Sequence, residues 1–414
     1  MQTVEALIIK TYRTAADLRQ CKGKQIKDAL LIMADLLEQN KRVLLKANAA
    51  DIAKQDADNP RNDRLLLNEE RISSIAKSIK NISRLPSPVG KQLEKRILAN
   101  GLVLKKMTVP LGVVGAIYES RPNVTFDIAA LCLRSQNGCL LKGSSDAEAT
   151  NKAAIKIIQQ ALRQSGINPF CIALLPADRE SVQHLLTATR YVDVIIPRGS
   201  GSLIQFVREN SLVPVIETGA GVCHIYVEQE ADIKKAVSIV VNAKVSRPSV
   251  CNAVDTILVD EAVAPQFLDI LKPELEKAGV QIFADAKARR LLKGYTQLQK
   301  ATQADFGREF LSLKCAIKVV KDINEALLHI RQYSTKHSEA IISKNKKQCE
   351  RFLHEVDAAV VYSNASTRFT DGEAFGLGAE IGISTQKLHA RGPFALEKLV
   401  TEKWVIQGNG QVRL

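Results

Sequence analysis

The chain has 414 residues, of which 46% are hydrophobic and 25% charged, and its formal net charge at pH 7 is +14. These proportions are typical of soluble globular proteins, and the length accommodates two or three domains. No apolar run approaches the ~18 residues that a membrane span requires, and residues 1–20 are too charged for a signal peptide. We therefore expect a cytoplasmic protein without a membrane partner.

The positive charge has two further interpretations besides a solvated helix surface. A nucleic-acid surface would need a basic stripe with interleaved aromatic side chains or a known module, but aromatic residues make up only 5% of the chain. A positive field could also steer an anionic substrate towards its site. The composition favours solvated helix faces and predicts no nucleic-acid partner.

The eight cysteines are scattered and form no C-x-x-C pair, which argues against zinc ribbons, thioredoxin motifs and a disulfide scaffold. Most lie in apolar segments, where a cysteine is usually a small buried hydrophobe. Cys251 is different, because the segment "AKVSRPSVCNAVDT" places it at a junction beside Arg247. A neighbouring positive charge is one of the features that make a thiolate reactive. No metal site is predicted.

The predicted elements begin with amphipathic helices up to about residue 85 and then a hairpin at Asn100-Gly101, a strong turn signal. Strands and helices then alternate. The apolar segments expected as strands are 112–119, 138–143, 171–176, 192–197 and 213–219, and the expected helices are 125–135, 145–166, 179–190 and 202–210. Near-continuous apolar strands that alternate with helices predict a parallel sheet covered on both faces.

The alternation restarts after residue 221 and predicts a second α/β unit. Its expected strands are 223–227, 255–259, 315–320 and 339–343, and its expected helices are 231–244, 265–279, 323–334 and 345–356. Residues 403–414 read as a short hairpin about Gly408 to Gly410. Projecting hairpins are candidates for subunit contacts, because unpaired strand edges seek partners.

Polar residues follow the strands of the first unit, at the sheet edge where ligands of open parallel sheets bind. They are rich in Arg, Lys, Gly and Ser, which suits a phosphate-bearing ligand. The full G-x-G-x-x-G fingerprint is absent, so an ordinary dinucleotide-binding motif is not predicted. The loops contain Glu119–Asn123, Lys142–Ser145, Arg198–Gly201 and Glu217–Gly219.

Five segments resemble the signature sequences of the glutamate-5-semialdehyde dehydrogenases, the gamma-glutamyl phosphate reductase branch of the aldehyde dehydrogenase superfamily. They are "VPLGVVGAIYESRPNVTFD", "DVIIPRGSGSLIQFVREN", "VPVIETGAGVCHIYV", "VVNAKVSRPSVCNAVDT" and "FGLGAEIGISTQKLHARGP". The resemblance covers essentially the whole chain. It implies an α/β fold with two doubly wound parallel-sheet domains and a projecting β-hairpin for oligomerisation.

The resemblance also implies domain boundaries and partners. An NADP-binding domain would comprise residues 1–95 and 111–220, a catalytic domain residues 221–385, and the oligomerisation hairpin residues 96–110 and 398–414. The expected reaction is NADPH-dependent reduction of L-glutamyl 5-phosphate to L-glutamate 5-semialdehyde and phosphate, in proline synthesis. The expected assembly is a homo-oligomer (dimer or tetramer), with a possible complex with glutamate 5-kinase.

In this family Cys251 is the nucleophile, which attacks the acyl phosphate and leaves a thioester for hydride to reduce. Arg247 would lower the thiol pKa or hold the anionic substrate, and the sequence leaves both roles open. Arg121 occupies the position of the superfamily's oxyanion asparagine, so we expect Asn123 to share that task and Arg121 to hold phosphate. The cationic His389 and Arg391 are expected to bind substrate.

The expected cofactor residues also follow from the resemblance. Lys142 matches a lysine that contacts the adenosine ribose, Ser144 lies where a 2′-phosphate would fit, and Glu309 matches a glutamate at the nicotinamide ribose. The remaining expected cofactor residues are Gly143, Arg198, Gly199 and Glu217.

Two other functions remain open from the sequence. Glu217 matches the base that activates water in hydrolytic aldehyde dehydrogenases, so such an enzyme is one alternative. A catalytically inactive nucleic-acid-binding protein on the same scaffold is the other. Binding of DNA without binding of NADPH would favour the latter.

Overall fold

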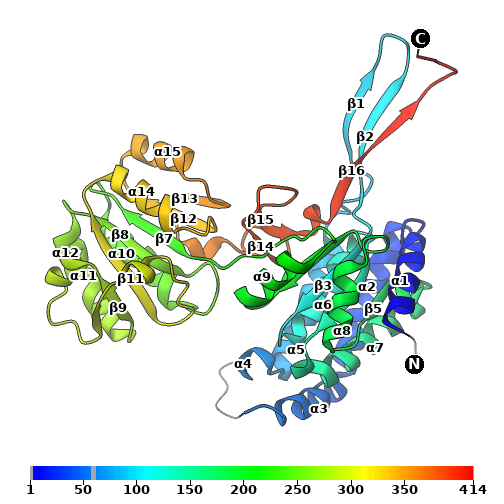
Figure 1. Ribbon diagram of the computed structural model, residues 1–414, viewed down its shortest axis with the longest axis horizontal. Helices are drawn as coiled ribbons and strands as arrows, with labels where there is room; N and C mark the ends of the chain where they lie inside the picture. The colour runs from blue at the N-terminus through cyan, green and yellow to red at the C-terminus, as the bar shows by residue number, and fades with distance from the viewer. Residues whose placement is uncertain (1–2, 57–61, 414) are drawn as a thin grey trace. The chain divides into compact units, whose positions relative to one another are not determined.

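The computed structural model describes residues 3–56 and 62–413, which divide into two compact units (Figure 1). Unit 1 comprises residues 1–218, 376–382 and 394–414, and unit 2 comprises residues 219–375 and 383–393. Each has its own parallel sheet and its own core, as the alternating strands and helices of the sequence predict.

Unit 1 contains a four-stranded parallel sheet in the order β5-β4-β3-β6. Its strands are β3 (Val113–Tyr118), β4 (Gly138–Gly143), β5 (Ile172–Leu174) and β6 (Val194–Arg198). The side chains of β3 and β4 are buried at every position, which explains why β3 is continuously apolar and why β4 is apolar apart from Lys142.

Helices cover both faces of this sheet. One face is covered by α1 (Val4–Leu18), α8 (Arg179–Thr187) and α9 (Gly201–Asn210), and the other by α6 (Pro122–Arg134) and α7 (Glu148–Gln164). A second helical layer packs on α6 and α7 and includes α2 (Gly23–Gln39), α3 (Lys41–Ile52) and α5 (Glu69–Arg84). The short α4 spans Asn62–Leu65.

A separate three-stranded antiparallel sheet also belongs to unit 1. It contains β1 (Gln92–Ile97), β2 (Val103–Pro110) and β16 (Val400–Gln407), with β2 in the middle. The predicted turn at Asn100-Gly101 is confirmed, and Gly101 adopts a φ of 86° there. The predicted C-terminal hairpin is wrong, because β16 pairs along its whole length with β2 and residues 408–413 form no strand.

Unit 2 is built on a seven-stranded parallel sheet in the order β10-β9-β11-β8-β7-β12-β13. Its strands are β7 (Cys223–Val227), β8 (Val254–Asp260), β9 (Gln281–Ala284), β10 (Leu298–Lys300), β11 (Lys314–Val320), β12 (Ser338–Ile342) and β13 (Val360–Ser363). The sequence prediction missed β9, β10 and β13, which are only three or four residues long.

Helices cover both faces of the unit 2 sheet as well. One face carries α10 (Ile233–Val245), α11 (Ala264–Lys277) and α12 (Ala286–Leu291), and the other carries α14 (Ile323–Tyr333) and α15 (Lys346–Glu355). The short α13 spans Gln303–Phe306. Finally, β14 (Glu380–Ser384) and β15 (Gly392–Ala395) pair in the segments where the chain passes between the units.

The predicted strand at residues 213–219 is also wrong. Only Val215 bridges to Ile195, and no regular strand follows. Pro214 lacks the backbone N–H that a longer ladder would require.

The core of unit 2 provides a test of the packing. Phe267 on α11 is fully buried, so Phe267→Ala should lower the free energy of unfolding by about 3–5 kcal/mol. Ile270, on the same helix, is 39% exposed, so Ile270→Ala should cost less than about 1 kcal/mol. Urea unfolding followed by circular dichroism measures both, and equal losses would contradict the packing.

Candidate active site

Cys251 lies at the amino edge of the unit 2 sheet. It follows the end of α10 at Val245 and precedes β8, which begins at Val254. Its side chain is half-buried, whereas Cys132, Cys139, Cys171, Cys223, Cys315 and Cys349 are buried. Cys251 therefore combines accessibility to a ligand with a place on a short loop between two regular elements.

The backbone of Cys251 is held from the neighbouring strand. The Sγ of Cys223, the first residue of β7, donates a hydrogen bond of 3.2 Å to the Cys251 carbonyl oxygen. Burial raises the pKa of the Cys223 thiol well above its usual range, with a further contribution from the Glu339 charge. Cys223 therefore keeps its proton and serves as a permanent donor.

Gly221 permits the closest approach to this loop. A Cβ on Gly221 would lie 1.8 Å from the Cys251 carbonyl oxygen, so any other residue would displace one of the two segments. The Gly221 N–H donates to Glu309 Oε1 at 2.9 Å. The structure thus brings Glu309, a predicted cofactor residue, next to the segment that packs on Cys251.

Asn252, directly after Cys251, is buried and hydrogen-bonded through both its side chain and its carbonyl oxygen. Its Nδ2 donates to the carbonyl oxygens of Thr370 at 2.9 Å and Arg368 at 3.3 Å, and its own carbonyl oxygen accepts from Thr367 Oγ1 at 2.7 Å. Arg368 also donates from Nη1 to Asn252 Oδ1 and from Nε to Ser246 Oγ, the latter at 3.2 Å. Sequence analysis missed Arg368, because nothing in its local segment indicates a partner more than 100 residues away.

The predicted substrate residues of unit 2 lie on the segment between β14 and β15. Arg391 forms an ion pair of 2.8 Å with Asp357, which also pairs with Lys387 at 3.0 Å and Lys336 at 3.3 Å. Hydrogen bonds from Lys387 and Arg391 hold the pKa of Asp357 well below its usual range. His389 adopts a positive φ of 63°, an uncommon conformation for a residue other than glycine.

Unit 1 brings together the loops after β3 and β6. Glu119 accepts hydrogen bonds of 2.8 Å from both the backbone N–H and the hydroxyl of Ser200. A Cβ on Gly199 would lie 2.7 Å from the Glu119 carboxyl group, so a larger residue there would require the Glu119 side chain to move. Together with Arg121, these residues line a small pocket beside the N-termini of α6 and α9. Arg198, the residue before Gly199, lies close to Gly382. A Cβ on Gly382 would be 2.4 Å from the Arg198 guanidinium group.

The side chain of Asn123 is directed to its own helix. Its Nδ2 donates to Asp127 Oδ2 at 3.1 Å, one turn along α6. Burial raises the pKa of Asp127 to about 6, and the hydrogen bond from Asn123 opposes this shift. The predicted role of Asn123 at an oxyanion therefore stays a prediction.

The predicted cofactor loop after β4 is the third loop of unit 1. Lys142 is 8% exposed and donates from Nζ to the Ala177 carbonyl oxygen at 3.0 Å. Burial lowers its pKa, and the Asp178 charge partly offsets that effect. A Cβ on Gly143 would lie 2.2 Å from Asn151 Nδ2, and Ser144 Oγ accepts from the Ser120 N–H at 3.3 Å.

The predicted site residues are divided between the two units. Unit 2 carries Cys251, Arg247, Glu309, His389 and Arg391. Unit 1 carries Arg121, Asn123, Lys142, Gly143, Ser144, Arg198, Gly199 and Glu217, and Glu217 lies 3.6 Å from Arg208.

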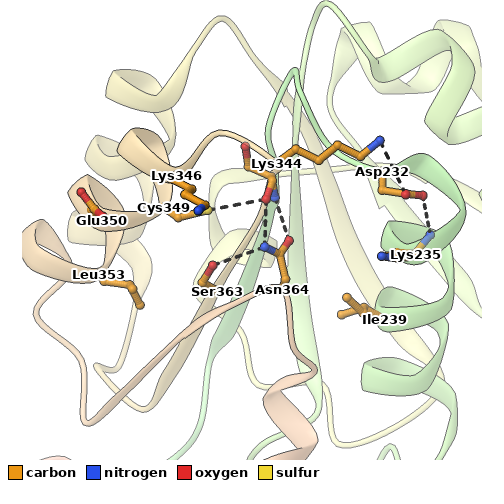
Figure 2. Close-up of a pocket in the computed structure, with 11 residues that line it drawn as sticks. Asp232, Lys235, Ile239, Lys344, Lys346, Cys349, Glu350, Leu353, Ser363 and Asn364 are labelled. Atoms are coloured by element: carbon orange, nitrogen blue, oxygen red, sulfur yellow. Dashed lines mark hydrogen bonds and ion pairs between the residues drawn. The ribbon is translucent and has the colours of Figure 1, made fainter.

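A groove of about 570 Å³ lies at the other edge of the unit 2 sheet (Figure 2). It is formed where β12 and β13 end, between the first turns of α10 and α15. Its lining carries three lysines, Lys235, Lys344 and Lys346, together with Asp232 and Glu350, and Lys344 reaches Asp232 at 3.6 Å. Cys251 is at the amino edge, so this groove does not border Cys251.

Comparison with known proteins identifies the family. Residues 1–288 match the sequence model described as the aldehyde dehydrogenase family. The chain belongs to the aldehyde dehydrogenase family. In residues 3–56 and 62–413, every helix is too short or too polar to span a bilayer.

Several curated relatives of this protein are identical to it at about half of the aligned residues. Gamma-glutamyl phosphate reductase from Pelodictyon phaeoclathratiforme is 49% identical over 100% of this chain and 99% of its own. The enzyme of the same name from Chlorobaculum parvum is 53% identical over 92% of this chain and 91% of its own.

Solved structures agree with the fold. Gamma-glutamyl phosphate reductase from Thermotoga maritima matches with a TM-score of 0.95 and 41% identity, covering 99% of this chain and 100% of that one. An acetylating aldehyde dehydrogenase from Geobacillus thermoglucosidasius matches with a TM-score of 0.71 and 16% identity, covering 99% of this chain and 97% of that one. The second match extends the fold to distant members of the family.

Gly221 provides a test of the contacts around Cys251. Gly221→Ala places a methyl group on the Cys251 carbonyl oxygen, so we expect a loss of about 1–3 kcal/mol in unfolding free energy and a changed rate of Cys251 alkylation. Gly201→Ala is the control, because no atom lies within 4 Å of that Cβ position. Urea unfolding and peptide mass spectrometry after iodoacetamide treatment measure the two effects. An unchanged Gly221→Ala protein would contradict the described contact.

Proposed function

We propose that this protein is a gamma-glutamyl phosphate reductase, which converts L-glutamyl 5-phosphate to L-glutamate 5-semialdehyde and phosphate in proline synthesis. The observation that carries the proposal is the end-to-end identity of about 50% to relatives of that name. The half-buried thiol of Cys251, on a loop fixed by its neighbours, supplies the nucleophile that the reaction needs.

The protein's own residues account for the first chemical step. The Cys251 thiolate attacks the acyl carbon, the bond between that carbon and the phosphate oxygen breaks, and phosphate leaves with the electron pair. The Cys251 backbone is held by Cys223 and packed on Gly221, so the attacking sulfur is presented from a fixed loop. The product of this step is a thioester on Cys251.

NADPH is the proposed reductant, and it supplies the hydride that reduces the thioester. The unit 1 loops have features that suit its phosphates. Lys142 is a mostly buried cation, and Ser144 offers a hydroxyl group. Gly143 and Gly199 have no Cβ, so their backbone lies close to neighbouring polar side chains. Arg198, Glu217 and, from unit 2, Glu309 complete the proposed set. An engineered glycolyl-CoA reductase with bound NADP⁺ has the same fold at 15% identity, with a TM-score of 0.69.

The remaining proposed site roles concern substrate. Asn123 is proposed to share oxyanion stabilisation, Arg121 to hold phosphate, and His389 and Arg391 to contact substrate. Arg247 is exposed on the Cys251 loop, where a positive charge suits an anionic substrate.

The three-stranded sheet of β1, β2 and β16 is the proposed self-association element. Its outer strands expose large apolar side chains, including Leu93, Ile97, Trp404 and Ile406. Two edge strands with apolar side chains favour a homo-oligomer. Residues 92–110 and 398–414 are thus proposed to serve assembly, the remainder of residues 1–220 to bind NADP, and residues 221–385 to carry catalysis, so that the expected boundary at residue 95 moves to the start of β1.

Two further proposals concern the cell. All eight cysteines are free, which supports a reducing compartment and hence the cytoplasm. Because an acyl phosphate hydrolyses readily in water, a complex with glutamate 5-kinase would protect the intermediate between the two enzymes.

The reaction run backwards separates this proposal from a hydrolytic dehydrogenase. With glutamate semialdehyde and NADP⁺, NADPH formation beyond one turnover should require inorganic phosphate and saturate with it, and arsenate should substitute. Cys251→Ala should retain less than a tenth of the wild-type rate, whereas Cys132→Ala should be active, since Cys132 is a core residue. Sustained turnover without phosphate, lost in Glu217→Gln, would instead establish hydrolysis.

Lys142 provides a test of cofactor choice. Removal of its charge should raise the Michaelis constant for NADPH about tenfold in Lys142→Ala and change that for NADH less, because only NADPH carries the 2′-phosphate. Steady-state kinetics with both cofactors measures the difference. Equal effects on the two constants would contradict a 2′-phosphate contact.

A further inference from the structure

Arg368 bridges the two ends of the loop that carries the nucleophile. It lies on the 3₁₀ turn Thr367–Phe369, which follows β13. Its guanidinium donates to Ser246, just before Arg247, and to the side chain of Asn252, just after Cys251. The Asn252 side chain donates back to the Arg368 carbonyl oxygen. These contacts fix a cation against the loop before any ligand arrives, as a binding site requires.

The guanidinium is held in an electrostatically unfavourable place. Burial lowers the pKa of Arg368, and repulsion from the nearby Arg247 lowers it further, while Asp371 and the Cys251 thiol act in the opposite direction. Two like charges held close together cost free energy that a bound dianion would recover. Such an arrangement beside a nucleophile is typical of functional sites.

Arg391, one of the two unit 2 cations that were expected to bind substrate, is already engaged in an ion pair. Arg391 lies 2.8 Å from Asp357, and Lys336 and Lys387 pair with the same carboxylate. Arg247 and Arg368 both lie beside Cys251, since Arg368 interacts electrostatically with both residues and hydrogen-bonds to Ser246 and Asn252. Hydrogen bonds to Asn252 and Ser246 use Nη1 and Nε of Arg368, which leaves Nη2 as a donor for a ligand.

We propose that Arg368, with Arg247, binds the phosphate group that Cys251 displaces from the acyl phosphate. This inference rests on the proposed function. As the carbon–oxygen bond breaks, the electron pair stays on the phosphate oxygen, and the guanidinium groups balance the developing negative charge. Arginine does not give up a proton, so phosphate leaves as an anion and the reverse reaction uses the same pair of cations to bind it.

Protection of Cys251 from alkylation tests the site without cofactor or turnover. Inorganic phosphate should slow the reaction of wild-type Cys251 with iodoacetamide in a saturable way, as followed by peptide mass spectrometry. Arg368→Gln should need about tenfold more phosphate for half-protection, and Arg368→Lys should fall between the two. Arg290→Gln, on the exposed side of α12, removes the same charge elsewhere and should match the wild type.

A second variant keeps the test decisive if Arg368→Gln fails to fold. Ser246→Ala removes the hydrogen bond to Nε and leaves the charge, so the phosphate needed for half-protection should rise about twofold to threefold. Absence of phosphate protection in the wild type would overturn the proposal. If Arg368→Gln folds, equal phosphate protection in that variant and in the wild type would overturn the proposal too. If Arg368→Gln does not fold, equal protection in Ser246→Ala and in the wild type would overturn it.

Kinetics distinguishes failure of this inference from failure of the proposed function. In the reverse reaction, Arg368→Gln should raise the Michaelis constant for phosphate about tenfold and that for the semialdehyde less. If wild-type turnover does not depend on phosphate, the proposed function itself is wrong. If it does, but Arg368→Gln leaves the phosphate constant unchanged, only the role of Arg368 is wrong.

Discussion

The contact between the Cys251 carbonyl group and Gly221 constrains the other contacts around Cys251. There is no space for a Cβ on Gly221 beside the Cys251 carbonyl oxygen. The segment before β7, which contains Gly221, is therefore packed directly on the loop before β8, which contains Cys251. Cys223 holds the same carbonyl oxygen, and Glu309 holds the Gly221 N–H, so both sides of the contact are hydrogen-bonded. The Cys251 thiol, the proposed nucleophile, is thereby positioned through its own backbone.

The two sheets place polar residues at opposite edges. In unit 1 the polar loops follow the carboxyl ends of β3, β4 and β6, as is usual for parallel sheets. In unit 2 Cys251, the proposed nucleophile, lies at the amino edge, and the groove at the carboxyl edge contains lysines offset by carboxylates (Figure 2). The amino edge instead gathers Arg247 and Arg368 beside Cys251, which is the charge pattern that an acyl phosphate requires.

Sequence predicted most of the fold, because buried parallel strands such as β3 are continuously apolar and the helices between the strands are amphipathic. The sequence prediction failed where the local pattern does not reveal which strands pair. Pro214 prevents the expected strand at residues 213–219 from forming a continuous ladder. The last strand, β16, pairs with β2, which lies nearly 300 residues earlier in the chain. Cys251 and Arg247 were found from their unusual junction and the family resemblance. Arg368 could not be found, because its contact with Asn252 joins distant segments and leaves no periodic signal.

The central claim is that the acyl group is bound to Cys251 as a thioester after phosphate has left and before hydride reduces it. Intact-protein mass spectrometry after mixing the enzyme with glutamate semialdehyde and NADP⁺ in phosphate-free buffer tests it most directly. A glutamyl adduct should accumulate, map to Cys251 in the peptide digest, and disappear when phosphate is added. Turnover with no adduct on Cys251, or an adduct that water removes as fast as phosphate does, would contradict the account.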